Sequence, residues 1–363
     1  MLGKHLSTEK LLEELLHRAS TAHECGSVMK RVKIPFAPSL EVEFTDREKG
    51  VEQVFEWAEK GTGFPVVIYG PEGCGKTSLL LQAVEILKEM NYSVIYFNPL
   101  RRRFEAEVGI ESVRQAILDR LKQVSTEHEF AKLIWLVIDV AVEALKHGKK
   151  RIAIIVDDAF QFMGVKEAAA LVKGMLEIIE HPEESYERIV AVAATSEGLS
   201  RFEIGRHRWA EIRAMWNMGK EGFEELYNRI PGPKPSFDDV WRLTGGNPAF
   251  LSRLYQARWD ANAVIHLLIE DKGISPSFIS KWRKWLEEAV RDPDTLWAPD
   301  APQELINELI ERNLIVYIMH RRLEYRWVDT PPPEKDLELG IGRHIAWQTP
   351  LHREAIKRAL QEL

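Results

Sequence analysis

The stretch Gly70-Pro71-Glu72-Gly73-Cys74-Gly75-Lys76-Thr77 matches the pattern G-x-x-x-x-G-K-[ST] at every fixed position. Its glycines allow backbone N–H groups to turn toward phosphate oxygens without a side chain in the way. The lysine adds positive charge beside the β- and γ-phosphates, and the hydroxyl after it is a ligand for Mg²⁺. We therefore expect a nucleoside phosphate to be bound by Gly70, Pro71, Gly73, Cys74, Gly75, Lys76, Thr77 and Ser78.

The residues on both sides of this loop have the periodicity that the motif requires. Residues 65–69 form a short apolar run that is typical of a buried strand. After the loop, apolar side chains recur at helical spacing at Leu80, Ala83, Val84, Leu87 and Met90. A helix that begins at Lys76 also directs its positive end toward a bound phosphate. A glycine-rich turn that only mimics the motif does not need this order of strand, loop and helix.

Two apolar segments downstream end in aspartate, and one of them is expected to supply the acidic residue of the site. Residues 134–139 continue without a turn signal toward His147-Gly148, which indicates a buried helix. Residues 152–158 are rich in β-branched side chains and end at Asp157-Asp158, which indicates a strand. We expect Asp157 to orient Mg²⁺ and Asp158 to act as general base for the attacking water. A turn or a helix N-cap is the alternative explanation of the pair.

A third strand is predicted at residues 189–194, and it ends in Thr195-Ser196. Polar groups at the carboxyl ends of parallel strands meet the ligand crevice. Thr195 or Ser196 is therefore a candidate to hydrogen-bond the γ-phosphate or the attacking water, and an ordinary helix N-cap is the alternative. Together with Lys76 and Asp158, Thr195 completes the predicted catalytic set.

Composition excludes several classes of protein. The 363 residues are 45% hydrophobic, enough for two or three domains. There is no uninterrupted apolar run of the length of a membrane span and no signal-peptide pattern at the N-terminus, so we expect a cytoplasmic protein that does not contact membranes. The two cysteines make neither a disulfide framework nor a metal site. The net charge of −7 argues against a surface coated for nucleic acid, although a local basic patch is compatible with it.

The order of the predicted elements indicates an α/β fold. From residue 64 to residue 216, strands and helices alternate, which is typical of a parallel sheet covered by helices. Before this region, Thr45 and Glu48 have the spacing of a capping box. The segment 231–235 is a proline-rich break, and the residues after it are mainly helical to about 291. A helix at 303–312, strands at 314–319 and 322–328 joined at His320-Arg321, and a final strand and helix predict a winged helix.

These features, taken in order, resemble a known family. The order is Phe44-Thr45-Asp46-Arg47-Glu48, the loop at 70–77, the acidic pair at 157–158, Thr195-Ser196, and Thr244-Gly245-Gly246-Asn247-Pro248. It is similar to the archaeal ATPase family, in the STAND branch of AAA+-type P-loop NTPases, over residues 40–270. The resemblance implies an N-terminal extension at 1–43, a P-loop ATPase core at 44–217, a helical lid at 218–291 and a winged-helix domain at 292–363.

The resemblance also implies further site residues. Gly246 and Pro248 correspond to the Gly-x-Pro of the lid, whose proline lies against the nucleotide. A glycine permits close backbone approach and a proline starts a helix with a flat apolar face, although a simple turn before a helix gives the same pattern. Asp46 and Arg47 are expected beside the adenine. His352 is a candidate to read the β-phosphate, with a solvated helix cap as the alternative.

One departure from the family concerns the γ-phosphate. Relatives often carry an arginine directly after the third strand, where this chain has Glu197. The candidates to replace it are Arg201, Arg206 and Arg208.

The sequence thus predicts ATP and ADP binding with Mg²⁺, slow hydrolysis, and a lid and winged helix that move as the nucleotide changes. A protein partner is expected, but the sequence does not name it. Two alternatives remain. One is a nucleotide-regulated module that binds DNA through His320, Arg321, Arg322 and Arg326 at the hairpin. The other is a switch that holds ADP without turnover.

Overall fold

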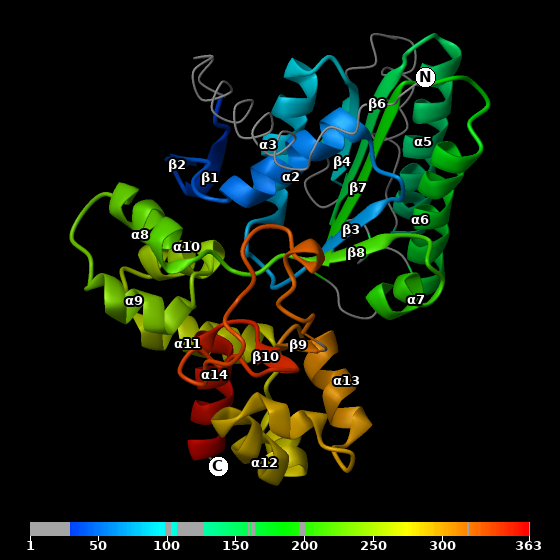
Figure 1. Ribbon diagram of the computed structural model, residues 1–363. Helices are drawn as coiled ribbons and strands as arrows, with labels where there is room; N and C mark the ends of the chain where they lie inside the picture. The colour runs from blue at the N-terminus through cyan, green and yellow to red at the C-terminus, as the bar shows by residue number, and fades with distance from the viewer. Residues whose placement is uncertain are drawn as a thin grey trace, which may run out of the picture. The chain divides into compact units, whose positions relative to one another are not determined.

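A parallel sheet positions the predicted phosphate-binding loop (Figure 1). The computed structural model describes residues 30–98, 103–106, 127–158, 160, 164–196, 200–317 and 319–362. Within these residues, six strands are arranged in the order β5-β4-β6-β7-β3-β8, and only the β4–β5 pair is antiparallel. The strands are β3 (Val66–Tyr69), β4 (Ser93–Asn98), β5 (Arg103–Ala106), β6 (Arg151–Asp157), β7 (Arg188–Thr195) and β8 (Glu211–Ala214). The predicted α/β class with a parallel sheet is confirmed.

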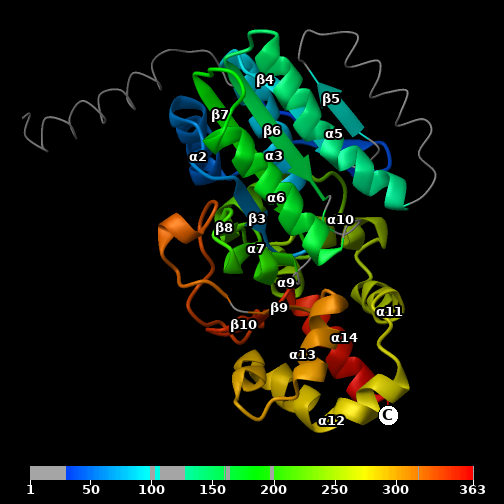
Figure 2. The same ribbon diagram turned by 90° about the vertical axis from the view of Figure 1, so that its right-hand side faces the viewer.

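Helices cover both faces of the sheet, which explains why its central strands are apolar throughout. Figures 1 and 2 show α5 and α6 on one face and α2 and α3 on the other. Their bounds are α2 (Glu48–Lys60), α3 (Lys76–Glu89), α5 (Glu127–Lys146) and α6 (Val165–Glu180), and the short α7 (Ser200–Arg206) precedes β8. The segment 134–139 lies in α5, as predicted. The register aligns Asp157 with Ala194 and Tyr69 with Thr195, so the ends of β3, β6 and β7 meet at one edge.

The residues after β8 are mainly helical. They form α8 (Lys220–Arg229), α9 (Phe237–Thr244), α10 (Pro248–Gln256), α11 (Ala261–Asp271), α12 (Pro276–Arg291), η2 (Pro293–Trp297), α13 (Gln303–Glu311), η3 (Glu324–Arg326) and α14 (Pro350–Gln361). Helices on both sides of residue 291 bury their apolar faces in one cluster, which includes Phe250, Leu286, Leu309 and Ile356. The predicted lid and the predicted C-terminal domain therefore share a core, and the boundary between them stays a prediction.

A short antiparallel hairpin precedes the sheet. It consists of β1 (Lys33–Ala37) and β2 (Leu40–Glu43), which pair Ile34 with Val42. The sequence predicted no strand here. The predicted capping box after the hairpin is wrong. Helix α2 begins at Glu48 after Arg47, whose backbone is left-handed, and the Thr45 hydroxyl donates to the Glu43 carbonyl instead.

The predicted pairing of strands 314–319 and 322–328 is also wrong. Strand β9 (Ile315–Tyr317) pairs with β10 (Ile345–Trp347), in register from Ile345 opposite Tyr317. The segment around η3 runs to β8 instead, where the Val328 N–H donates to the Ala214 carbonyl at 2.7 Å. Trp327 is buried beside that strand, where it forms a bridge with Ala214 and not with β9.

The sequence also predicts helices at residues 10–18 and 110–124, and both segments lie outside the described residues. In the part of the chain that the structure describes, no helix is both long enough and apolar enough to span a membrane.

Candidate functional site

The loop between β3 and α3 has backbone conformations that glycine adopts without strain. Gly73 and Gly75 have φ values of 76° and 104°, in the region where side chains cause strain. Gly70 is required for a different reason, because a Cβ there would lie 1.9 Å from the Met215 carbonyl oxygen of the segment after β8. Cys74 is fully buried inside the loop, which fits a small packing residue. The loop therefore presents backbone N–H groups at the start of α3, as the motif predicts.

Lys76 and Thr77 begin helix α3 with their polar groups on the loop side. The Lys76 Nζ donates to the carbonyl oxygens of Gly70 at 3.0 Å and Pro71 at 2.8 Å, which holds the ammonium group inside the loop. The Thr77 hydroxyl lies 3.3 Å from Asp157 Oδ1 and 3.5 Å from Asp158 Oδ2. The structure thus brings the predicted Mg²⁺ residues, Thr77 and Asp157, together.

Asp157 is held in place by residues that sequence reasoning missed. Its side chain is fully buried at the end of β6, and its Oδ2 accepts hydrogen bonds from the Tyr96 hydroxyl at 2.9 Å and from Asn98 Nδ2 at 2.8 Å. Both donors come from the neighbouring strand β4. The available signal was Asn98, a polar residue at the carboxyl end of an apolar strand, where parallel strands meet a ligand. These bonds leave Oδ1 directed to Thr77.

Asp158 and Thr195 lie at the same edge of the sheet but differ in exposure. Asp158 has a left-handed backbone with φ 51°, its N–H donates to the Ala194 carbonyl, and it lines the cavity described below. Thr195 is buried and is not among the residues that line the cavity, whereas Ser196 is. Of the two hydroxyls left open by the sequence, Ser196 is therefore the one that faces the ligand space.

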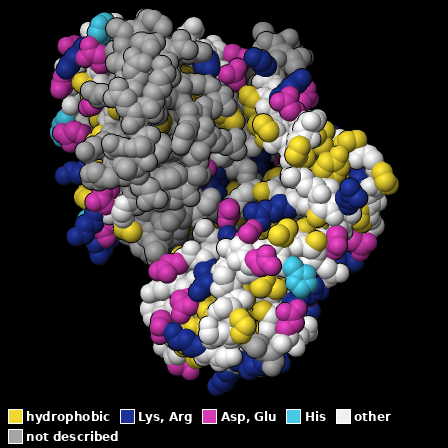
Figure 3. All heavy atoms as spheres, turned by 180° about the vertical axis from the view of Figure 1, so that it is seen from behind, with side chains coloured by type: hydrophobic (Ala, Val, Ile, Leu, Met, Phe, Trp, Pro, Cys, Tyr) yellow, Lys and Arg dark blue, Asp and Glu magenta, His cyan; other side chains and the backbone are white. Residues whose placement is uncertain are grey.

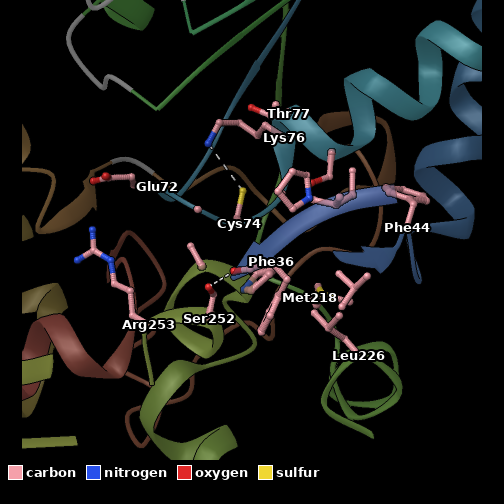
Figure 4. A pocket seen from close by; sticks show the side chains of 18 of the residues that line it. Phe36, Phe44, Glu72, Cys74, Lys76, Thr77, Met218, Leu226, Ser252 and Arg253 are labelled. Atoms are coloured by element: carbon pink, nitrogen blue, oxygen red, sulfur yellow. Dashed lines mark hydrogen bonds between the residues drawn. The ribbon is translucent and has the colours of Figure 1, made fainter. Parts of the chain in front are cut away.

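A cavity of about 720 Å³ adjoins the loop (Figure 4). Its wall near the loop is polar, and the wall across from it is mainly apolar. Figure 4 shows Lys76 and Thr77 on one side, with Phe36, Met218 and Leu226 across from them. A volume of this size is in the range of small-molecule and cofactor sites. The lining residues include Gly73, Cys74, Gly75, Lys76, Thr77, Ser78, Asp158, Ser196, Met218, Leu226 and Pro248.

The Gly-Gly-Asn-Pro segment contacts the loop directly. Asn247 caps helix α10 through its side-chain oxygen, and its Nδ2 donates to the Glu72 carbonyl at 2.9 Å. The Ala249 N–H lies 3.3 Å from the Gly73 carbonyl, and a Cβ on Gly73 would lie 2.3 Å from the Ala249 Cβ. Pro248 lines the cavity. Gly246 does not line it; its φ is 80°, and its backbone lies so close to the Met218 carbonyl that a side chain would not fit.

Comparisons with known proteins agree with this geometry. The model of a family described as an ATPase domain predominantly from Archaea matches residues 44–254. The chain belongs to this family. It is therefore an ATPase. A comparison with curated protein sequences found no match.

The similarity of this ATPase to solved structures is low. Cdc6p from Pyrobaculum aerophilum is 14% identical, with a TM-score of 0.37 over 91% of this chain and 99% of that one. The Aeropyrum pernix ORC1 protein, solved in complex with DNA, is 15% identical, with a TM-score of 0.35 over 93% and 95%. AMPPCP-bound DnaA from Aquifex aeolicus is 14% identical, with a TM-score of 0.37 over 78% and 81%.

The residues of the ATPase site fit a magnesium ion of the kind that nucleotides carry. Mg²⁺ keeps several waters and is usually held by one or two carboxylates together with substrate phosphates. The Thr77 hydroxyl and the Asp157 carboxylate supply such a partial set. A complete protein cage is not expected, and among the described residues no group of three or more His, Cys, Asp or Glu side chains is placed to hold a metal.

Asp46 and Arg47, expected beside the adenine, lie at the start of α2. The Arg47 guanidinium is buried and donates to the carbonyls of Cys74 at 2.7 Å and Trp216 at 2.9 Å, and it pairs with Asp329 at 2.8 Å. Arg47 lines the cavity, but these contacts connect the loop to the segment after η3. Asp46 is not among the lining residues. Burial raises its pKa to about 6, against the opposing effect of Arg47.

His352 lies at the start of α14, fully buried and outside the cavity lining. Its Nδ1 is 2.8 Å from the Thr349 hydroxyl, and its ring meets that of Phe250 edge to face. Burial lowers its pKa well below the ordinary value, and the charges of Lys272 and Arg253 add to the effect. The ring is therefore neutral at pH 7, so any contact with a phosphate would require its N–H rather than a positive charge.

Of the arginines considered for the γ-phosphate, neither Arg206 nor Arg208 is among the residues that line the cavity. Arg206 pairs with Glu203 on the surface, Arg208 is exposed, and the side chain of Arg201 is outside the described set. Sequence reasoning missed Arg253, which lines the cavity from α10 and, in Figure 4, lies near Glu72 of the loop. Burial raises the pKa of Glu72, but the nearby charges of Lys272 and Arg253 hold it below its ordinary value.

Proposed function

We propose that this ATPase binds ATP or ADP with Mg²⁺ in the cavity beside residues 70–77, hydrolyses ATP slowly, and works as a nucleotide-controlled conformational switch of the STAND kind. The observation that supports it most directly is the contact of the Gly-Gly-Asn-Pro segment with the phosphate-binding loop. Asn247 binds the Glu72 carbonyl, and Pro248 lines the same cavity as Lys76. Residues more than 170 positions apart therefore line the same cavity.

The chemistry requires positioned charge more than covalent steps. Lys76 is placed to neutralise charge on the β- and γ-phosphates, and Thr77 and Asp157 would hold Mg²⁺. When bound, Mg²⁺ neutralises negative charge that develops on the phosphate oxygens. Asp158, exposed to the cavity, is the group placed to accept a proton from the attacking water. We propose Ser196, rather than Thr195, as the hydroxyl that contacts the γ-phosphate or that water.

The origin of the cavity walls supports the proposed switch. Loop residues contribute one wall, and α10 contributes Pro248, Ala249, Ser252 and Arg253 to another. A ligand shifts a conformational equilibrium only by its difference in affinity for the two states. A nucleotide that contacts both walls binds the closed arrangement more tightly than the open one. ATP and ADP would then differ in this preference, because only ATP has a γ-phosphate that Arg253 could contact from α10. We also propose that the protein acts in the cytoplasm and that a protein partner reads the state of the switch.

The aspartates test the assignment of roles. Asp158→Asn should bind Mg²⁺-ATP with nearly unchanged affinity and lose hydrolysis, because it removes a base without altering the residues that hold the phosphates. Asp157→Asn should weaken the dependence of binding on Mg²⁺ itself. Calorimetric titration with and without Mg²⁺, together with phosphate release, separates the two effects. An equal loss of ATP binding in both variants would contradict these roles for the two aspartates.

We propose DNA binding through His320, Arg321, Arg322 and Arg326 only as a second function, because one of these four side chains is already engaged within the protein. The Arg322 guanidinium donates to the carbonyls of His320, Pro333 and Gly342 among others, so it is engaged within the protein. Figure 3 views the molecule from behind, and on the lower part of that side Lys and Arg are interspersed with Asp and Glu. Filter binding to duplex DNA at two salt concentrations tests this alternative, and specific, salt-dependent retention would support it.

A further inference from the structure

We infer that the β1–β2 hairpin is part of the nucleotide site, and that Ile34 is a base-contacting residue whose neighbour Phe36 anchors the hairpin in the helical region. The inference rests on the proposed nucleotide binding and extends it to a segment outside the matched family range. That range begins at residue 44, whereas the hairpin occupies residues 33–43.

One face of the hairpin forms cavity wall. Ile34 lies directly opposite Val42 in the antiparallel register, so both side chains point to the same side of the hairpin. Both line the cavity, together with Phe36 and with Phe44, which follows β2. This apolar surface adjoins Met218, Leu226 and Pro248. Because the loop holds the phosphates at the polar end, the group left to occupy this apolar end is the nucleobase.

The hairpin is tied to the elements on both sides of the cavity. On the side of the P-loop core, the Val32 N–H donates to Gln82 Oε1 of helix α3 at 3.0 Å. At the base of the hairpin, the Phe44 N–H donates to the Val32 carbonyl. On the helical side, the Ser252 hydroxyl of α10 donates to the Phe36 carbonyl (Figure 4). Glu43 also lies 3.7 Å from Arg229 of α8.

Phe36 provides the anchor. Its ring is buried in the apolar cluster of the helical region with Phe223, Leu226 and Phe250, and it lies 6.2 Å from the Tyr255 ring. An aromatic side chain inserted into another element's core fixes the position of its own backbone. Ile34, two residues earlier in the same strand, is thereby held at the cavity that α3 and α10 also line.

The hairpin therefore determines how tightly the base, rather than the phosphates, is held. Removing the Ile34 side chain beyond Cβ should weaken base contact and leave the loop intact. Ser252→Ala, which removes the tie to Phe36, should speed nucleotide release for the same reason. Glu41 supplies a matched control, because it is exposed on the hairpin and does not line the cavity.

The test compares a ligand with a base and one without it. Dissociation constants for ADP and for pyrophosphate are measured with Mg²⁺, by competition against fluorescent mant-ADP, on the full chain of wild type, Ile34→Ala and Glu41→Ala. We expect Ile34→Ala to raise the constant for ADP about ten-fold, which is about 1.4 kcal/mol, and that for pyrophosphate by less than about two-fold. Glu41→Ala should change neither, and Ser252→Ala should release mant-ADP faster.

Two results would overturn this inference without contradicting the proposed function. One is an unchanged ADP constant in Ile34→Ala, and the other is equal weakening of ADP and pyrophosphate, which would indicate damage to the loop. If wild type binds neither ligand, the proposed function fails and this inference fails with it.

Discussion

The buried ion pair between Arg47 and Asp329 connects the phosphate-binding loop to the segment after η3, and breaking it should have a large effect. The two groups lie 2.8 Å apart and are 3% and 6% exposed. Removing one partner of a buried pair costs about 3–5 kcal/mol, because the other charge stays buried. In Asp329→Asn the guanidinium keeps its bonds to the carbonyls of Cys74 and Trp216, so we expect the lower end, about 3 kcal/mol.

The chain offers a matched control. Lys49 and Glu324 also join α2 to η3, at 3.0 Å, but they are 51% and 82% exposed. Exposed pairs contribute only about 0–1 kcal/mol, so Glu324→Gln should leave the melting temperature nearly unchanged. Calorimetric unfolding of both variants and wild type gives the comparison, and Asp329→Asn should melt on the order of 5 °C lower. Equal, small shifts in the two variants would refute a structural role for the buried pair.

Two further predictions follow from the same geometry. Pro248→Ala should weaken ATP binding several-fold. It should also shrink the nucleotide-induced change in tryptophan fluorescence, since seven of the eleven tryptophans follow residue 240. Unchanged affinity and fluorescence would show that the Gly-Gly-Asn-Pro segment is only a turn. For Asp46, burial places the folded-state pKa at about 6, above its ordinary value of 3.8, although Arg47 opposes the shift. Ionisation therefore favours unfolding, and the stability that the protonated group contributes is present below pH 4 and lost as pH rises to about 6. Asp46→Asn should thus raise the melting temperature more at pH 8 than at pH 4, and equal shifts at the two pH values would contradict this.

The sequence was sufficient for the parts of the site that depend on local pattern. The loop, the strands beside it and the acidic pair at 157–158 each follow from short-range periodicity and from residue types with fixed chemistry. The carboxyl ends of parallel strands gather at one edge of a sheet, so the meeting of Thr77 with Asp157 was predictable without coordinates.

Contacts between distant segments were not predictable in this way. The hairpin at 33–43 is short and contains Pro35, and its role depends on helices α3 and α10 far along the chain. Arg47 was expected at the adenine because of the family pattern, but its guanidinium bonds to Cys74, Trp216 and Asp329, which lie far apart in the sequence. The strand predicted at 322–328 failed because Trp327 is buried beside β8, which no local pattern could indicate.

We propose that residues 70–77 bind the phosphates of an adenine nucleotide, and calorimetric titration with Mg²⁺-ATP measures this binding. Wild type should bind one nucleotide per chain. Lys76→Ala should remain folded, as judged by circular dichroism, and should lose tight binding, because the ammonium group held at Gly70 and Pro71 is gone. Equal affinity in wild type and variant, or tighter binding of GTP than of ATP by wild type, would contradict this claim.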